Sequence, residues 1–169
     1  MIKFLEKFND KSNKVVQKLL IIIFILMTVF IFLQVIFRYV LKSSLSWSEE
    51  LSTYLFIWLT FLGASVGIRN GAHIKVMFFV NNIKNIILRK CIITFSNSLS
   101  IIFLIILSYY GTIIANQIFV LDQISASMPF LRIGVVYFAI PIGSILMTTN
   151  LLEITINVWS KPEQIEGGN

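Results

Sequence analysis

Four long runs without a charged residue constrain this chain more than any other feature. The runs are residues 19–37, 51–68, 91–121 and 133–152. A helix needs about 20 apolar residues to cross the hydrocarbon core of a bilayer, and it satisfies its own backbone hydrogen bonds there. We therefore predict that the chain crosses a membrane four times as α-helices.

The composition predicts the same fold class. Hydrophobic residues make up 57% of the chain and charged residues 13%, whereas a soluble domain is about a quarter charged. The net charge of +6 comes from basic residues between the runs, which indicates membrane topology and contact with anionic lipid rather than nucleic acid. We predict an all-α integral membrane protein with a single domain, 1–169, and spans at about 16–40, 48–69, 90–118 and 131–155.

Two of the runs have informative lengths. The first, 19–37, is longer than the roughly 7 to 15 residues of a signal-peptide core and lacks a small-residue cleavage site after it, so we expect a retained helix. The third, 91–121, would extend about 46 Å as a straight helix. We predict one tilted helix that projects beyond the membrane, with Asn116 and Gln117 near the far surface.

The positions of Lys and Arg predict the orientation, because short cytoplasmic segments are enriched in them. The loop after the first run carries Arg38 and Lys42, and the loop after the third carries Arg132. The N-terminal tail and the middle loop carry five each: Lys3, Lys7, Lys11, Lys14 and Lys18, and Arg69, Lys75, Lys84, Arg89 and Lys90. We predict that both of these segments are cytoplasmic, and that the even number of spans returns the C-terminal tail to the same side.

Two short segments outside the spans have an apolar character. Ile2, Leu5 and Phe8 recur at helical spacing among the lysines of the N-terminal tail, which is typical of an amphipathic helix in the head-group region. The middle loop contains residues 76–80, Val-Met-Phe-Phe-Val. This segment is too short to span, so we predict that it lies on the cytoplasmic surface of the membrane.

The spans contain almost nothing that could carry chemistry. Every charged residue falls at a predicted boundary, and the only histidine, His73, lies in the middle loop. The sequence offers no metal-ligating constellation, no Ser-His-Asp set and no phosphate-binding glycine loop, and its lone Cys91 cannot form a disulfide within the chain. We therefore predict no catalytic residue, metal or cofactor, and we expect the chain to function by packing against a partner.

The start of the second span has two polar features. The sequence Ser46-Trp47-Ser48-Glu49 fits a capping box, in which the Ser46 hydroxyl and the Glu49 carboxylate each accept a backbone N–H of the other. Arg38 ends the first span about ten residues earlier. An ion pair of Arg38 with Glu49 or Glu50 would neutralise charge at the membrane edge, and the alternative is that each side chain reaches water separately.

Aromatic residues mark one face of the second span. Trp47, Leu51, Tyr54 and Trp58 share that face by helical spacing. In one interpretation Trp47 belongs to the interfacial aromatic belt and the other three residues pack inside the chain. The alternative is a seam against a partner protein.

Small residues and a proline define the remaining candidates. Gly63, Gly67 and Gly71 are four residues apart, and small residues at this spacing let helix backbones approach closely in lipid. The partner helix could belong to this chain or to another. In the last span, Tyr137 precedes Pro141 by four residues, and the proline predicts a kink.

Taken in order, several pieces of the sequence resemble the small membrane (Q-type) subunit of TRAP transporters, the tripartite ATP-independent periplasmic transporters. With four spans, the resemblance covers nearly the whole chain apart from its tails. The matching pieces are 37–39 (Phe-Arg-Tyr), 46–50 (Ser-Trp-Ser-Glu-Glu), Trp58, 63–64 (Gly-Ala), 69–74 (Arg-Asn-Gly-Ala-His-Ile), 128–129 (Met-Pro) and 136–141 (Val-Tyr-Phe-Ala-Ile-Pro).

The resemblance implies a function that the residues alone do not show. TRAP systems import organic acids such as C4-dicarboxylates and sialic acids across the bacterial inner membrane. A periplasmic protein captures the substrate, a large elevator-type subunit carries it with a sodium gradient, and the small subunit extends the static scaffold. We expect this chain to be such a scaffold, with the large subunit as a separate partner, and its candidate interface residues are Arg38, Trp47, Glu49, Glu50, Tyr54, Trp58, Gly63, Gly67, Tyr137 and Pro141.

Two other classes of function are weaker alternatives. An autonomous oligomeric channel or exporter of this size usually places an acidic or other charged residue inside the membrane, and the runs contain none. A membrane-embedded enzyme would need polar groups that converge. His73 and the pair Glu49 and Glu50 lie on opposite sides of the membrane in the predicted topology, so they cannot meet.

Overall fold

The computed structural model of the chain describes residues 2–70 and 85–160, and every helix or strand among them is an α-helix. Four segments are long and apolar enough to cross a membrane, which confirms the predicted fold class. The last of these segments contains two helices, α5 and α6. The elements are α1 (Ile2–Tyr39), α2 (Ser46–Arg69), α4 (Ile86–Val120), α5 (Ile133–Tyr137) and α6 (Ala139–Ser160).

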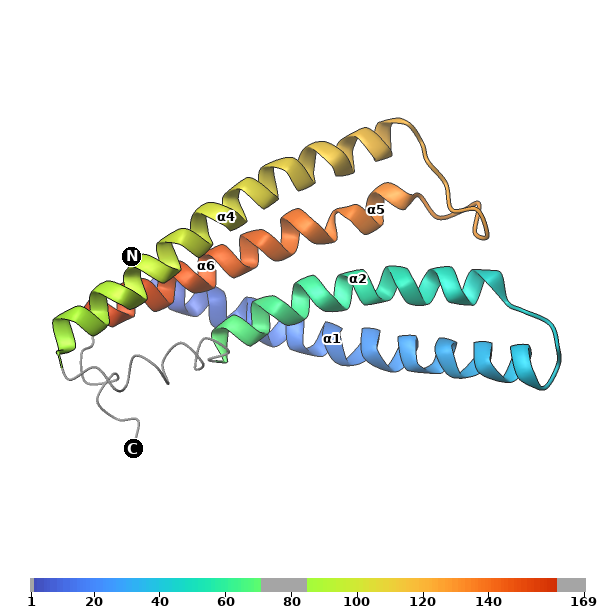
Figure 1. The fold of residues 1–169 in the computed structure, drawn as a ribbon, viewed down its shortest axis with the longest axis horizontal. Coiled ribbons are helices and arrows are strands. Elements are labelled where there is room, and N and C mark those ends of the chain that lie inside the picture. Colours follow the sequence, from blue (N-terminus) through green and yellow to red (C-terminus); the bar gives the residue numbers. More distant parts are fainter. Residues whose placement is uncertain (1, 71–84, 161–169) are drawn as a thin grey trace.

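The helices stand side by side in the order α1, α2, α6, α4 (Figure 1). The chain thus forms two antiparallel hairpins, α1 with α2 and α4 with α5 and α6, which meet where α2 packs on α6. α1 and α4 occupy the two edges, and α1 reaches α6 through its first turns. This open row leaves apolar side chains exposed on both of its faces.

The core lies along α6, because α6 has a neighbouring helix on each side. In the most apolar stretch of the last span, 44% of the residues are buried. In the most apolar stretch of α1, no residue is buried. Leu104 of α4 packs there against Met147 and Leu151 of α6, and Leu151 is fully buried. A second small cluster joins Ile93 of α4 to Val158 of α6.

The closest helix contacts are made at glycines of α4, α5 and α6. A Cβ atom on Gly143 would lie 2.7 Å from the Phe61 side chain of α2, and one on Gly134 would lie 2.9 Å from the Phe119 backbone. A Cβ on Gly111 would meet Ile140 at 2.7 Å. Gly63 of α2 is less constrained, since its nearest neighbour, the side chain of Leu20, would be 4.0 Å away.

The last span is interrupted, as the proline predicts. α5 ends at Tyr137 and α6 begins at Ala139, with Phe138 between them. Pro141 lacks the N–H that would bond the Tyr137 carbonyl in a continuous helix, so the helix is broken at this turn. The short α5 still packs on α4, which keeps the span together.

Two expectations about element boundaries have different outcomes. α4 is one helix of 35 residues, as predicted for the third run, and Gln117 lies in its last turn. The N-terminal tail does not form a separate helix, because residues from Ile2 onward belong to the single 38-residue helix α1. Its Asn9 is buried against α6, which draws the segment into the helix row. The predicted surface segment at 76–80 lies outside the described residues.

Candidate partner interface and two polar clusters

A cluster of charged side chains joins α1, α2 and α6 at the end of the helices where α1 begins and α2 finishes. Arg69, in the last turn of α2, donates from Nη1 to Oε2 of Glu153 at 2.7 Å and from Nη2 to Asp10. The side chains of Arg69 and Glu153 are 18% and 10% exposed, whereas that of Asp10 is 62% exposed. A cation at a helix C-terminus also complements the helix dipole, so Arg69 is favourably placed at this end.

Two amides complete this Arg69 cluster. Asn9 donates from Nδ2 to Oε2 of Glu153 at 2.6 Å, the same oxygen that Arg69 binds. It also donates to the Thr149 carbonyl at 3.1 Å. Asn150 donates to the Ser65 carbonyl at 3.0 Å. A buried carboxylate is costly unless it is paired and hydrogen-bonded, and here both conditions are met.

The sequence analysis used Arg69 and Glu153 only as boundary markers and missed their pairing. The two residues are 84 positions apart, and a single sequence gives no register between α2 and α6. The available signal was a pair of asparagines, Asn9 directly before Asp10 and Asn150 three residues before Glu153.

A second cluster lies at the opposite end of the helices, around Glu50 near the start of α2. Its carboxylate accepts hydrogen bonds from the Tyr54 hydroxyl, the Ser127 hydroxyl and, at 3.1 Å, the Ser127 N–H. Ser127 belongs to the connection between α4 and α5, so this Glu50 cluster fastens that connection onto α2. It joins the 46–50 piece of the sequence to Ser127, the residue directly before the 128–129 piece.

The connection between α4 and α5 is itself folded. Ile124 and Arg132 form an isolated antiparallel bridge, and Ser125 N–H donates to the Leu131 carbonyl at 3.0 Å. The buried Ser125 hydroxyl accepts from the Met128 N–H at 3.0 Å. These bonds hold Ser127 in position to meet Glu50.

We expect Glu50→Ala to loosen this connection, because hydrogen bonds to a charged group contribute about 1.5–3 kcal/mol each. The measurement is hydrogen exchange of the 124–128 amides in the purified chain, where the variant should exchange at least about tenfold faster. Glu49→Ala is the matched control, since Glu49 is exposed and accepts one bond, from Gln34 at 3.1 Å. Equal exchange rates in the two variants would show that Glu50 does not hold the connection.

The start of α2 packs on α1 through backbone and aromatic contacts. The Ser48 hydroxyl donates to the Phe30 carbonyl at 2.9 Å, and the rings of Trp47 and Phe30 meet edge to face with centroids 5.8 Å apart. The predicted capping box is wrong: α2 already includes Ser46, Leu45 is its N-cap, and no side chain bonds the cap. Glu49 turns instead toward Gln34 of α1.

The ion pair of Arg38 with Glu49 or Glu50, one of the two alternatives that the sequence leaves open, is not formed. The structure pairs Arg69 with Asp10 and Glu153, and it pairs Arg132 with Asp122. The carboxylates of Glu49 and Glu50 accept hydrogen bonds from uncharged donors instead. Arg38 lies exposed in the last turn of α1.

The structure separates the other candidate residues into two groups. Three of them lie at contacts within the chain. Tyr54 bonds Glu50, Gly63 faces Leu20, and Pro141 lies against Gly111. Trp58 and Gly67 are half-buried on α2, and Trp47 and Tyr137 are 39% and 36% exposed. The aromatic face of α2 is therefore divided, since Trp47 contacts α1 and Tyr54 contacts the α4–α5 connection.

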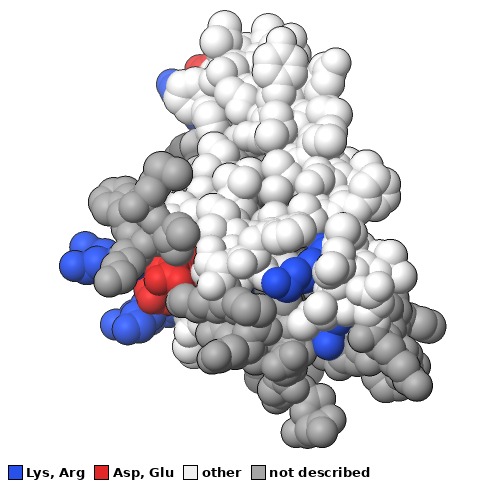
Figure 2. Space-filling model, turned by 90° about the vertical axis from the view of Figure 1, so that its left-hand side faces the viewer, with Lys and Arg blue, Asp and Glu red and all other residues white. Residues whose placement is uncertain are grey.

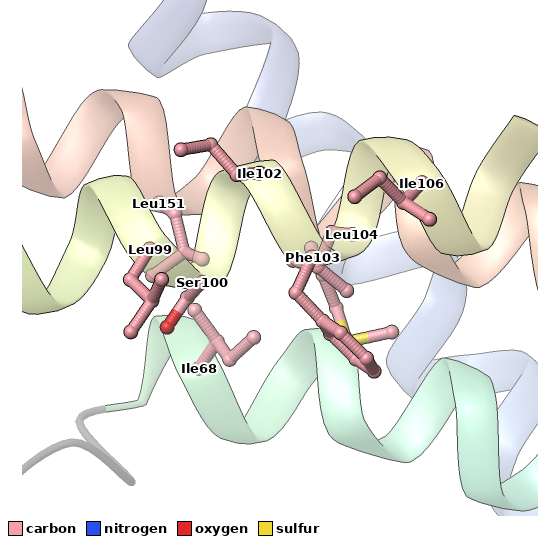
Figure 3. Close-up of a pocket in the computed structure, with 9 residues that line it drawn as sticks. Ile68, Leu99, Ser100, Ile102, Phe103, Leu104, Ile106 and Leu151 are labelled. Atoms are coloured by element: carbon pink, nitrogen blue, oxygen red, sulfur yellow. The ribbon is translucent and has the colours of Figure 1, made fainter.

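An apolar groove runs along one face of the row between α2 and α4, with α6 at its base. This α2–α4 groove has a volume of about 580 Å³. Leu99 of α4 lies near Ile68 of α2 toward one end of it, and Phe103 and Ile106 of α4 lie toward the other (Figure 3). A second groove, between α4 and α6, has a volume of about 410 Å³ and is lined in part by Ile105 and hydroxyl-bearing residues.

These features define a class of protein. The chain is an all-α, multi-pass membrane protein whose described charges gather in clusters at the ends of the helix row and whose faces are apolar. Within the described residues no three His, Cys, Asp or Glu side chains gather where they could hold a metal ion. The surfaces available for recognition are therefore the exposed apolar faces and grooves.

Comparison with known proteins narrows the class to one family. The family model described as "Tripartite ATP-independent periplasmic transporters, DctQ component" matches residues 4–161. The chain therefore belongs to the DctQ component family of TRAP transporters. It is thereby a non-catalytic, multi-pass component of the bacterial inner membrane.

Three relatives illustrate the match. A Haemophilus influenzae protein, named provisionally as a TRAP transporter small permease protein, is 34% identical over 140 residues, which are 83% of this chain and 84% of the relative. The C4-dicarboxylate TRAP transporter small permease protein DctQ of Rhodobacter capsulatus is 30% identical over 66% of this chain and 48% of its own length. The sialic acid TRAP transporter permease protein SiaT of Haemophilus influenzae is 31% identical over 73% of this chain and only 20% of its own length.

Proposed function

We propose that this chain is a static scaffold that binds a separate, large elevator-type membrane subunit during sodium-driven import of an organic acid. The observation that carries the proposal is the open row of helices, which leaves apolar faces exposed and gathers its charges at the two ends. A moving carrier usually needs ionisable groups inside the membrane. A scaffold needs instead a rigid row with an uncovered apolar surface.

The relative SiaT supports a large partner for this chain. The region of SiaT that resembles this chain is about a fifth of that protein. The other four fifths of the SiaT polypeptide are therefore linked covalently to a small-subunit-like region. We propose that the corresponding partner of this chain is a separate polypeptide that docks on the same kind of surface.

The proposed substrate class and orientation follow from the relatives and from the charges. Two relatives carry names for C4-dicarboxylate and for sialic acid, so we propose an organic acid of one of these types, delivered by a periplasmic binding protein. We also propose that both termini are cytoplasmic, because the N-terminal tail and the middle loop hold most of the Lys and Arg residues. The Glu50 cluster would then face the periplasm.

The α2–α4 groove is the surface that we propose for the large subunit. It is apolar, it lies on the membrane-spanning part of three helices, and its exposed wall includes Leu99, Phe103 and Ile106 of α4, each at least half exposed. Helices associate in lipid through close packing, so a long groove offers more contact than a flat face. A partner that extends to the Glu50 cluster would gain further contacts there, with Trp47, Tyr137, Arg38 and Glu49.

Two neighbouring isoleucines test this surface directly. Ile106 lines the α2–α4 groove and is 51% exposed, whereas Ile105 lines the α4–α6 groove and is 55% exposed. We expect Ile106→Trp to reduce co-purification of the large subunit with the tagged chain by roughly tenfold, since overpacking costs about 1–3 kcal/mol. Ile105→Trp should leave it unchanged.

The alternative outcomes are distinct. If Ile105→Trp weakens the complex and Ile106→Trp does not, the scaffold role stands and the docking face is the opposite one. If the unmodified chain co-purifies only with copies of itself, the scaffold proposal is wrong and a small oligomeric channel takes its place. Sodium-dependent uptake by vesicles that contain this chain alone would also overturn the scaffold role.

A further inference from the structure

A stripe of lysines runs along the first turns of α1. Lys7, Lys11, Lys14 and Lys18 are spaced by four, three and four residues, which places them on one face of the continuous helix. All four are exposed. Figure 2 shows this end of the molecule, where Lys and Arg side chains lie beside a carboxylate patch and uncharged residues form most of the surface.

A groove of about 480 Å³ lies next to the lysine stripe, between α1 and α6. Lys11 and Ser12 supply its polar lining. The remaining lining is apolar: Phe8, Val15, Val16 and Leu146. This α1–α6 groove is therefore amphipathic, with a cation beside an apolar channel.

The groove runs from the charged end of the helices toward the middle of the spans. Asp10, which precedes the lining residue Lys11 in the chain, pairs with Arg69, and the neighbouring Asn9 bonds Glu153. Leu146 lies seven residues before Glu153 along α6, which is about 10 Å toward the membrane centre. Asp10 and Glu153 share the cation of Arg69, and the ionisable side chain that lines the groove is that of Lys11.

We propose that the α1–α6 groove binds one anionic phospholipid, with its phosphate at Lys11 and Ser12 and an acyl chain along Val15, Val16 and Leu146. Apolar residues gain little over bulk lipid by contacting an acyl chain, so selectivity comes from the head group. A basic residue near the membrane surface favours anionic lipid by about fivefold. The proposal concerns the chain itself and does not depend on the large subunit.

The test is native mass spectrometry of the purified full chain after equilibration with equal amounts of phosphatidylglycerol and phosphatidylcholine. We expect one phosphatidylglycerol molecule to be retained in preference to phosphatidylcholine, and Lys11→Gln to reduce that preference by about fivefold. Lys42→Gln is the matched control, because it removes the same charge at the other end of α1. It should leave the preference intact.

A second variant separates the groove from the charge. Val15 is 52% exposed and lines the groove, so Val15→Trp should fill it and abolish retention of both lipids without altering helicity by circular dichroism. Equal retention of the two lipids by the unmodified chain would overturn the proposal. The same conclusion would follow if Lys11→Gln and Lys42→Gln reduced the preference equally, or if Val15→Trp kept its bound lipid.

Discussion

Replacing Arg69 with alanine is expected to lower the free energy of unfolding of the chain by about 3–5 kcal/mol, because the substitution leaves a buried carboxylate without its cation. The side chain of Glu153 is 10% exposed, and of its partners among the described residues the amide of Asn9 would remain. The measurement is unfolding by SDS in mixed micelles, followed by circular dichroism. Arg69→Ala should shift the transition strongly to lower SDS fractions.

Arg132→Ala is the control for this experiment. Arg132 forms an ion pair with Asp122 at 2.9 Å, but the two side chains are 51% and 63% exposed. An exposed pair contributes about 1 kcal/mol or less, so its loss should be small. A double variant, Arg69→Met with Glu153→Leu, should recover much of the lost stability, because no unpaired charge is left. If Arg69→Ala and Arg132→Ala shift the transition equally, the Arg69 cluster does not stabilise the fold.

Gly143→Ala is expected to cost about 1–3 kcal/mol of stability, through overpacking between α6 and α2. The added Cβ would lie 2.7 Å from the Phe61 Cβ, 3.1 Å from the Phe61 carbonyl oxygen and 3.2 Å from its carbonyl carbon. Two of these three neighbours are backbone atoms, so the clash cannot be relieved by a rotamer change alone. The same SDS unfolding assay measures the effect.

Gly63→Ala is the matched control on α2. Its Cβ would meet only the end of the Leu20 side chain, at 4.0 Å, and alanine is favoured over glycine inside a helix by about 1 kcal/mol. We expect this variant to be as stable as the unmodified chain or slightly more stable. A larger loss for Gly63→Ala than for Gly143→Ala would place the close helix contact at the α2 glycines and contradict the packing described above.

The sequence predicts the helices well because each span is specified locally. Runs of about 20 uncharged residues give the number of spans without any knowledge of packing. The continuity of α4 and the break before Pro141 also follow from local properties, namely the absence of a turn within 91–121 and the missing N–H of proline. The same local reasoning fails at the N-terminus, where Asn9 makes the tail part of the helix row.

Contacts between helices are poorly predicted because they depend on register. The spacing of Gly63 and Gly67 is compatible with close packing, yet the tight approach between α2 and α6 occurs at Gly143 of α6. Arg38 is a candidate partner of Glu50 in the sequence because both lie near one loop. The actual partner of Glu50 is Ser127, 77 residues away.

The arrangement of the row has a consequence for biogenesis. α1 and α2 form one hairpin and emerge from the ribosome first, so Arg69 can pair with Asp10 as soon as this hairpin enters the translocon. Glu153 is translated 84 residues later, within α6. We therefore expect the two hairpins to insert separately and to join only when α6 arrives, which makes the pairing of Arg69 with Glu153 the closing step of assembly in the membrane.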